Sequence, residues 1–166
     1  PCFSRRTSCF HAEAVRSRLQ KEGISTEGIT DWDLCSVVCG FQIAAVERLR
    51  RLCEQSGAKI VLETSWKCMR NLDEMKRLFS LWRLDSYIVD MTDNEEMFFK
   101  EGAIQRYLDA HPAVENYVIL DDISMRKAFP GHDVVTPDIL DEESYRQALH
   151  ILNHWTKELG HEHHLP

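Results

Sequence analysis

The sequence predicts an α/β domain, a Rossmann-like and mostly parallel sheet flanked by helices. Helical and strand-like segments alternate with short connections from residue 42 onward. In addition, residues 117–122 place four apolar residues directly before two carboxylates, and an unbroken apolar run is typical of a parallel strand covered on both faces. The 166 residues, 43% hydrophobic and 28% charged, suffice for one compact domain.

The chain divides into an N-terminal helical segment (1–40), a core (41–160) and a tail (161–166). In the first segment we expect a helix over 11–22, and the apolar run 34–39 is a candidate strand. Periodicity and turn residues predict the core elements in this order: helix 42–56, strand 59–62, helix 72–82, strand 87–89, helix 99–110, strand 117–120, strand 132–135, and a last helix capped by Asp141 and ended by Gly160. On helix 42–56 the apolar face contains Ile43, Val46, Leu49 and Cys53.

Composition and charge limit the classes of function that the sequence allows. A formal net charge of -7 disfavours a broadly basic surface for duplex nucleic acid. No apolar run approaches the roughly 20 residues that span a bilayer, and no signal-peptide pattern opens the chain. Six cysteines without a Cys-x-x-Cys pair indicate free thiols in a reducing compartment, with a Cys2–Cys9 disulfide as the alternative. We therefore expect a cytoplasmic protein without a membrane partner.

Asp121 and Asp122 are the first candidate site residues, because ligands of parallel sheets collect at the carboxyl ends of the strands. Adjacent carboxylates repel each other, so both stay ionised only beside a cation, or else one is protonated. A metal site is one interpretation. A solvated turn or a helix N-cap is the other, since Asp is common at both.

Thr64 and Ser65 follow strand 59–62 and should lie at the same edge of the sheet. Hydroxyl and backbone N–H groups there suit a phosphate oxygen, although either residue could simply cap the next helix. Lys100 lies near the start of its helix, where an ammonium group either bridges a phosphate and a carboxylate or is solvated surface.

Together these residues resemble the haloacid dehalogenase (HAD) superfamily of phosphohydrolases, and most closely the small HAD-like domain of multifunctional RNA-repair proteins. The resemblance covers about residues 41–152. "SGAKIVLETSW" is similar to the second motif of that group, and "KEGAIQRYL" followed by "ENYVILDD" is similar to its third and fourth motifs. "GHDVVTPDILDEESYRQAL" resembles its closing strand and helix.

The resemblance implies roles for the candidate residues. Thr64, or alternatively Ser65, would hydrogen-bond the transferring phosphoryl group, and Lys100 would neutralise its charge and steady the nucleophile. Asp121 and Asp122 would hold Mg2+, with Asp122 as the direct ligand. Mg2+ is therefore the expected cofactor.

The first motif of active HAD members is missing. It is an apolar strand ending in Asp-x-Asp-Gly, whose first Asp is the nucleophile and whose second is the general acid and base. Asp31 and Asp33 have the carboxylate spacing and are the catalytic candidates here, but a poor buried strand precedes them and the glycine is absent. Cys39 is a weaker candidate, because nothing nearby in the sequence would lower its pKa.

The missing strand also predicts a gap in the sheet, since in this fold it lies between the strands of the second and fourth motifs. Such a gap leaves two rows of backbone groups unpaired. The strand could lie upstream, be replaced by residues 34–39, or come from another chain. We favour the first explanation because the chain opens with Pro, and residues 1–32 would then be a small cap inserted after the nucleophile strand.

Histidines near the C-terminus suggest a zinc site only weakly. His150 and His154 are spaced i, i+4 on the last helix, and His161, His163 and His164 follow. Because no His-Glu-x-x-His arrangement occurs, we interpret them as exposed polar positions.

Three functions remain open. The first is a Mg2+-dependent phosphohydrolase that works through an aspartyl-phosphate if the nucleophile motif exists upstream. The second is a catalytically inactive HAD-like module with a binding or regulatory role. The third and weakest is a phosphatase for nucleic-acid ends. The expected partner is accordingly a phosphorylated small molecule or a nucleic-acid end, and the oligomeric state is not readable from the sequence.

Overall fold

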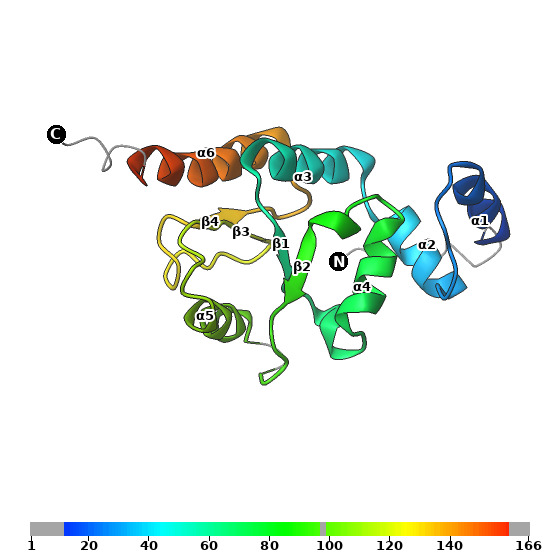
Figure 1. Cartoon of the computed structure of the whole chain (residues 1–166), viewed down its shortest axis with the longest axis horizontal. Helices are drawn as coiled ribbons and strands as arrows, with labels where there is room; N and C mark the ends of the chain where they lie inside the picture. Colours follow the sequence, from blue (N-terminus) through cyan, green and yellow to red (C-terminus); the bar gives the residue numbers. More distant parts are fainter. Residues whose placement is uncertain (1–11, 97–98, 160–166) are drawn as a thin grey trace.

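The computed structural model describes residues 12–96 and 99–159. Among them, four strands form two separate parallel pairs, β1 (Ile60–Leu62) with β2 (Ile88–Met91) and β3 (Ile119–Asp121) with β4 (Asp133–Val135). The helices are α1 (Ala12–Lys21), α2 (Asp31–Gly40), α3 (Ile43–Ser56), α4 (Leu72–Ser80), α5 (Lys100–Ala110) and α6 (Glu142–Leu159), with short 3-10 turns η2 (Ser65–Cys68) and η3 (Asp85–Tyr87). Figure 1 shows α3 and α6 side by side along one side of the strands.

The predicted α/β class and the order of elements from residue 42 onward are confirmed. Local signals explain the boundaries. Gly57 ends α3 in a left-handed conformation (φ 73°), which favours glycine, and Asn71 opens α4 with a capping box to Glu74. Asp141 caps α6 as predicted, because its Oδ1 accepts the Ser144 N–H at 2.8 Å. The predicted end of this helix, Gly160, lies outside the described residues.

Two predictions about the first helices were wrong. Residues 34–39 form part of α2 and not a strand, because Thr30 caps this helix and the i, i+3 pair Leu34 and Val37 supplies a completely buried helical face. On α3, Val46 and Cys53 are buried as expected, but Ile43 is 62% exposed and Leu52 is buried instead. The start of α3 at Ile43 therefore lies outside the core, whereas Val46 in the same turn belongs to it.

Each strand pair has its own hydrophobic core. The core beside β1 and β2 includes buried residues of α1, α2 and α4: Ala12, Leu19, Ile29, Leu34, Val37, Leu62, Met75, Leu78, Leu81 and Ile88. The second core joins β4, α3 and α6: Leu52, Val134, Leu140, Tyr145, Ala148 and Leu152. Residues 12–40 thus pack on the β1–β2 half and share its core.

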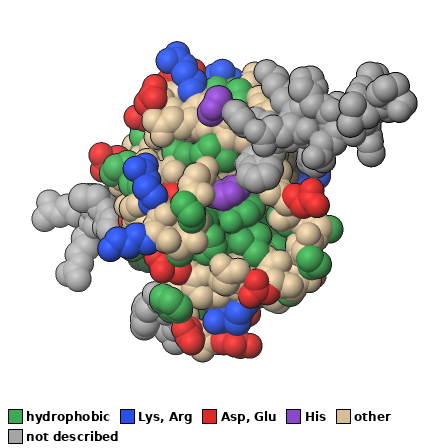
Figure 2. Space-filling model, turned by 90° about the vertical axis from the view of Figure 1, so that its left-hand side faces the viewer, with side chains coloured by type: hydrophobic (Ala, Val, Ile, Leu, Met, Phe, Trp, Pro, Cys, Tyr) green, Lys and Arg blue, Asp and Glu red, His purple; other side chains and the backbone are tan. Residues whose placement is uncertain are grey.

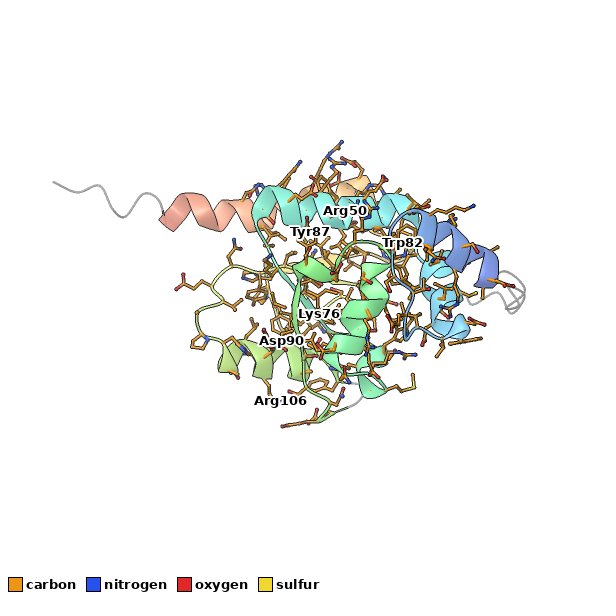
Figure 3. All side chains as sticks on the ribbon, turned by 45° about the vertical axis from the view of Figure 1, so that its right-hand side comes forward. Arg50, Lys76, Trp82, Tyr87, Asp90 and Arg106 are labelled. Carbon is orange, nitrogen blue, oxygen red and sulfur yellow. The ribbon has the colours of Figure 1, made fainter. Side chains whose placement is uncertain are left out.

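Helix α3 connects the two halves. Its Arg50 guanidinium donates to the Trp82 carbonyl at 2.6 Å, in the segment that leads from α4 to β2 (Figure 3). Its Gln55 accepts a hydrogen bond from the Tyr145 hydroxyl of α6 at 2.6 Å. The Trp82 side chain also reaches back to α2, donating from Nε1 to the Val37 carbonyl at 3.1 Å. These contacts fix both strand pairs to one helical layer.

A third, smaller cluster holds α5 against β3. Ile119 of β3 packs with Met125 and Phe129 of the following loop, and Ile104 and Leu108 of α5 cover them. The face of the molecule on this side has apolar side chains in its middle and charged side chains around them (Figure 2). Because α5 is packed on β3, the start of this helix has a fixed position beside the carboxyl end of the strand.

No helix in the described part of the chain is both long and apolar enough to cross a bilayer.

Candidate active site

The carboxyl end of β3 brings one lysine and two aspartates together. Lys100, the first residue of α5, donates from Nζ to Asp121 Oδ2 at 2.6 Å. The same Nζ lies 3.9 Å from Asp122 Oδ1. The folded chain therefore brings three of the candidate site residues, Lys100, Asp121 and Asp122, together at one sheet edge.

The two aspartates differ in how much of their carboxylate is available. The Asp121 side chain is 8% exposed, and both of its oxygens accept hydrogen bonds, Oδ2 from Lys100 and Oδ1 from the Ile123 N–H at 3.0 Å. The Asp122 side chain is 57% exposed. Asp122 is therefore the carboxylate that is open to a ligand from solution.

Electrostatics keep Asp122 ionised at neutral pH. The interaction of its side chain with that of Asp121 outweighs desolvation and, together with the positive charge of Lys100, lowers the pKa of Asp122 below its ordinary value. The cation that offsets the repulsion between the neighbouring carboxylates is thus, at least in part, the Lys100 ammonium group.

The donor set is chemically suited to Mg2+, a hard cation that prefers oxygen ligands. Such an ion commonly binds one or two carboxylates and takes its other ligands from water and phosphate oxygens. Within residues 12–96 and 99–159, no group of three or more His, Cys, Asp or Glu side chains is arranged to hold a metal. Asp122, with Asp121 behind it, therefore fits a partial magnesium site that needs further oxygen ligands.

Thr64 and Ser65 lie on the turn after β1. The Thr64 hydroxyl oxygen accepts the Trp66 N–H at 3.4 Å and caps η2, as the capping alternative predicted. Ser65 is exposed. No hydrogen bond or ion pair between the described residues joins Thr64 or Ser65 directly to Lys100, Asp121 or Asp122.

The outer edges of β1 and β3 are free of strand partners in the part of the chain that the structure describes. β1 pairs only with β2, and β3 pairs only with β4, each in parallel. Each of these four described strands therefore has one edge without a strand partner, and two of them, β1 and β3, are followed by candidate site residues. The described strands thus form two separate pairs, and the place of a missing strand between β1 and β3 stays a prediction.

The family comparison agrees with this arrangement. A family model described as the HAD domain in Swiss Army Knife RNA repair proteins matches residues 8–140. The chain belongs to this family. No curated protein and no solved structure matches the chain. The match begins well before residue 41, where the sequence resemblance starts, so α1 and α2 are part of the matched HAD domain.

Asp31 and Asp33 of the HAD domain lie in the first turn of a helix and not at the end of a buried strand. Asp31 accepts from Arg16 at 2.7 Å, and Asp33 pairs with Arg70. The Thr30 hydroxyl also donates to Asp33 at 2.8 Å. Both carboxylates thus have local partners, and both lie in the first helical turn, where negative charge is stabilising.

The cysteines and histidines that the structure describes add no further centre to the HAD domain. Cys39 is exposed near the end of α2, and Cys53 is buried in α3, where desolvation raises the pKa of its thiol. Cys2 and Cys9, proposed as a disulfide, lie outside the described residues. So do His161, His163 and His164, and the side chain of His154 is likewise not described.

A buried polar cluster at the carboxyl ends of β1 and β2 escaped the sequence analysis. Lys67 pairs with Glu63 and donates to the Thr92 hydroxyl at 2.6 Å. The i, i+4 spacing of Glu63 and Lys67 is visible in the sequence, but this spacing is common on solvated surfaces. Thr92 follows a different strand, and only the fold brings it to the pair.

Proposed function

We propose that this HAD domain supplies the phosphate-binding and metal-binding half of a Mg2+-dependent phosphomonoester hydrolase. The observation that carries the proposal is the group of Lys100, Asp121 and Asp122 at the carboxyl end of β3. It combines a half-buried ammonium group, a fully bonded carboxylate and an exposed, ionised carboxylate. These are the charges needed to bind a phosphate together with a hard cation.

Each residue has a separate role in the proposal. Asp121 holds the Lys100 ammonium group in place through the 2.6 Å hydrogen bond, and Lys100 offsets the negative charge of the phosphoryl group. Asp122 is the metal ligand, and Mg2+, when bound, would supply Lewis-acid stabilisation of the phosphoryl oxygens. The Ser65 hydroxyl and the Thr64 segment would bind another phosphoryl oxygen from the β1 side.

The nucleophile in this proposal is an aspartate on a strand that pairs between β1 and β3. Two parallel strands with free edges, each followed by site residues, support this position. A strand inserted there in the same direction would end between Thr64 and Asp121 and place its last side chains among the candidate residues. Asp31 and Asp33 fit this role poorly because they lie on α2 and are paired with Arg16 and Arg70.

A catalytically inactive binding module is the second candidate function. The observation that favours it is the same gap, since no strand among the described residues ends in Asp-x-Asp. A nucleic-acid end is a candidate substrate for either function. Arg126 and Lys127 follow the aspartates as exposed cations, and the family is named for RNA repair.

The test is phosphatase activity on p-nitrophenyl phosphate, with and without Mg2+, for the product of the complete coding region. The key variant is Asp122→Asn, which keeps the shape of the side chain and removes its charge. The matched control is Asp109→Asn, because Asp109 is exposed and lies in the last turn of α5, at the opposite end of this helix from Lys100.

The proposal expects Mg2+-dependent turnover that Asp122→Asn abolishes and Asp109→Asn preserves. Full activity of Asp122→Asn would contradict the site assignment. No turnover in the unmodified protein, on this ester or on 3'- and 5'-phosphorylated oligonucleotides, would favour the inactive binding module. A strong preference for the oligonucleotides would identify nucleic-acid ends as the substrate.

A further inference from the structure

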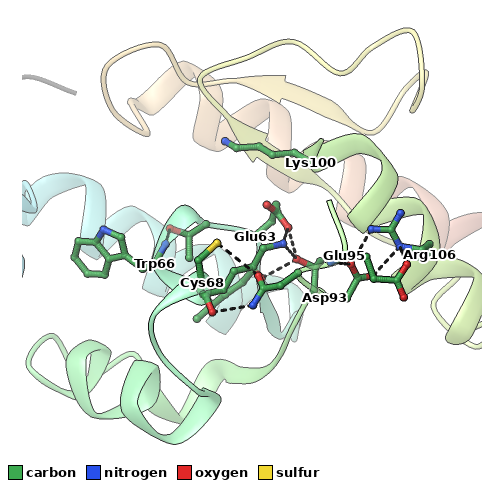
Figure 4. A network of polar contacts seen from close by, with 12 residues as sticks. Glu63, Trp66, Cys68, Asp93, Glu95, Lys100 and Arg106 are labelled. Carbon is green, nitrogen blue, oxygen red and sulfur yellow. Dashed lines mark hydrogen bonds and ion pairs between the residues drawn. The ribbon is translucent and has the colours of Figure 1, made fainter. Parts of the chain in front are cut away.

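Lys67 is a residue of the η2 turn and forms a polar cluster with Glu63 and Thr92. It is buried at the carboxyl end of β1. Its side chain is 3% exposed and that of Glu63 is 14% exposed. The ammonium group pairs with Glu63 and donates to the Thr92 hydroxyl at 2.6 Å, and Thr92 in turn donates to the same Glu63 oxygen. These three side chains therefore form a closed ring of contacts, within the polar network that Figure 4 shows around Glu63.

The cluster ties together the loops that follow two neighbouring strands. Thr92 N–H donates to the Leu62 carbonyl at 3.1 Å and extends the pairing of β1 and β2. Asn94 Nδ2 donates to the Lys67 carbonyl at 3.0 Å, and the Cys68 thiol lies 3.8 Å from Asn94 Oδ1. Residues 63–68 and 92–94 are therefore joined by side-chain and backbone contacts at several points.

The second of these loops is also fixed to the helix that carries Lys100. Arg106 of α5 makes a two-point contact with Asp93, from Nε at 2.9 Å and from a terminal nitrogen at 2.7 Å. A continuous set of contacts thus runs from the Thr64 and Ser65 turn through the 92–94 loop to α5 (Figure 4). Such packed networks are one physical means by which the positions of two sites become coupled.

Burying a charged pair is an expensive way to join two loops. Removing two charges from water costs free energy that their attraction repays only with good geometry, and an apolar pair of similar size often stabilises a fold equally well. An ion pair with a third hydrogen-bonding partner differs from an apolar contact because it is directional. Each donor must lie at the right distance and angle from its acceptor, so the bonded groups have fixed relative positions. In this cluster the bonded groups come from the end of β1, the η2 turn and the loop after β2.

We propose that Lys67 is a positioning residue for phosphate binding. Held by Glu63 and Thr92, it sets the turn that carries Thr64 and Ser65 relative to the loop that leads to α5 and Lys100. The inference rests on the proposed function for its ligand, since the hydroxyls and Lys100 would bind the phosphoryl group from opposite sides. Lys67 itself is buried and does not touch the phosphate.

The experiment uses the double variant Glu63→Gln/Lys67→Met in the full chain. It removes both charges together, and the side-chain amide introduced at position 63 still accepts the Thr92 hydroxyl, so no unpaired buried charge is left to unfold the protein. The control is Arg48→Met/Glu142→Gln, which removes a half-buried ion pair between α3 and α6 with a separation of 3.3 Å. Two quantities are measured: amide hydrogen exchange, and affinity for inorganic phosphate with Mg2+ present.

We expect exchange of residues 64–68 and 92–94 to rise about tenfold in the Glu63/Lys67 variant, with the rest of the fold unchanged. Phosphate affinity should fall by a similar factor, and the Arg48/Glu142 control should change neither quantity. A folded Glu63/Lys67 variant with wild-type exchange in both loops and wild-type phosphate affinity would overturn the positioning role. Absence of phosphate binding in the unmodified chain would instead contradict the proposed function, and loop exchange alone would then decide whether Lys67 couples the two loops.

Discussion

The carboxyl ends of the two strand pairs carry similar groups in opposite states. After β1 and β2, Lys67 and Glu63 form a buried pair completed by Thr92. After β3, Lys100 is bound to Asp121 but lies near the surface, and Asp122 beside it is 57% exposed. The charged groups of the first cluster are paired with each other and buried. In the second cluster the Asp122 carboxylate and the partly exposed Lys100 ammonium group are available to a ligand.

This comparison shows how charged residues that stabilise the fold can be distinguished from charged residues that are available to a ligand. A lysine beside a carboxylate occurs in both places, so residue type and pairing do not distinguish them. The two clusters are distinguished by the exposure of their charged groups and by the number of contacts that each charged atom makes. We therefore expect changes in the first cluster to act mainly on stability and loop order, and changes in the second to act mainly on ligand binding.

The largest effect on stability should come from Lys67→Met alone. This change leaves the Glu63 carboxylate buried without its cation, which costs about 3–5 kcal/mol in comparable buried pairs. Urea denaturation monitored by tryptophan fluorescence measures the loss. A decrease below about 1 kcal/mol, the range of surface pairs, would remove the contrast between the two clusters.

A smaller effect is expected from Asp33→Asn in α2. The variant weakens the pair with Arg70 and the contact with Thr30, so the free energy of unfolding should fall by about 1–2 kcal/mol. Mg2+-dependent phosphatase activity of the complete protein should remain, because the account gives Asp33 no part in the chemistry. Loss of activity in a stably folded Asp33→Asn protein would restore this residue as a nucleophile candidate.

Lys100→Met should have the opposite effect to that expected of Lys67→Met, with little loss of stability and a large loss of phosphate binding. Because Lys100 is 32% exposed, the free energy of unfolding should change by about 1 kcal/mol or less. Phosphate affinity in the presence of Mg2+ should nevertheless fall below detection in a calorimetric titration. Retained phosphate binding in this variant would show that the ammonium group is surface charge, as one interpretation of the sequence allowed.

The smallest expected effect is on the titration of Asp122. Its folded pKa is lowered, so the stability it contributes is present above its unfolded pKa of about 3.9 and is lost as the pH falls through the folded value. Removing the positive charge in Lys100→Met should raise the pKa of Asp122. A carboxyl-detected NMR titration measures both proteins, and an unchanged pKa would mean that Lys100 does not influence this carboxylate.

The sequence was informative where a single segment carries the signal. Apolar runs, Gly57 and the Asp141 cap predicted most element positions, and the acidic end of β3 predicted where charges gather. It misled at residues 34–39, because an unbroken run of apolar and small residues fits a buried strand and a buried helix face equally well. The Thr30 cap decides for the helix, and a cap of this kind is recognised only once the helix is known.

Other features depend on contacts between distant segments. Lys67 looks like a surface lysine in a short turn, and its burial arises because Thr92 and Asn94 follow the neighbouring strand. The separation of the sheet into two pairs also follows from tertiary structure. It was foreseen only through the family resemblance, which indicated that a strand between β1 and β3 was missing.

The most direct test of the account is whether a divalent cation binds at the β3 carboxyl end. Mn2+ can replace Mg2+ at oxygen sites, and it broadens NMR signals of nearby amides. The account predicts that signals of residues 120–123 and 100–101 broaden first, that Asp122→Asn removes this broadening, and that Asp109→Asn keeps it. Broadening that is spread over the acidic surface, or that persists unchanged in Asp122→Asn, would contradict the account.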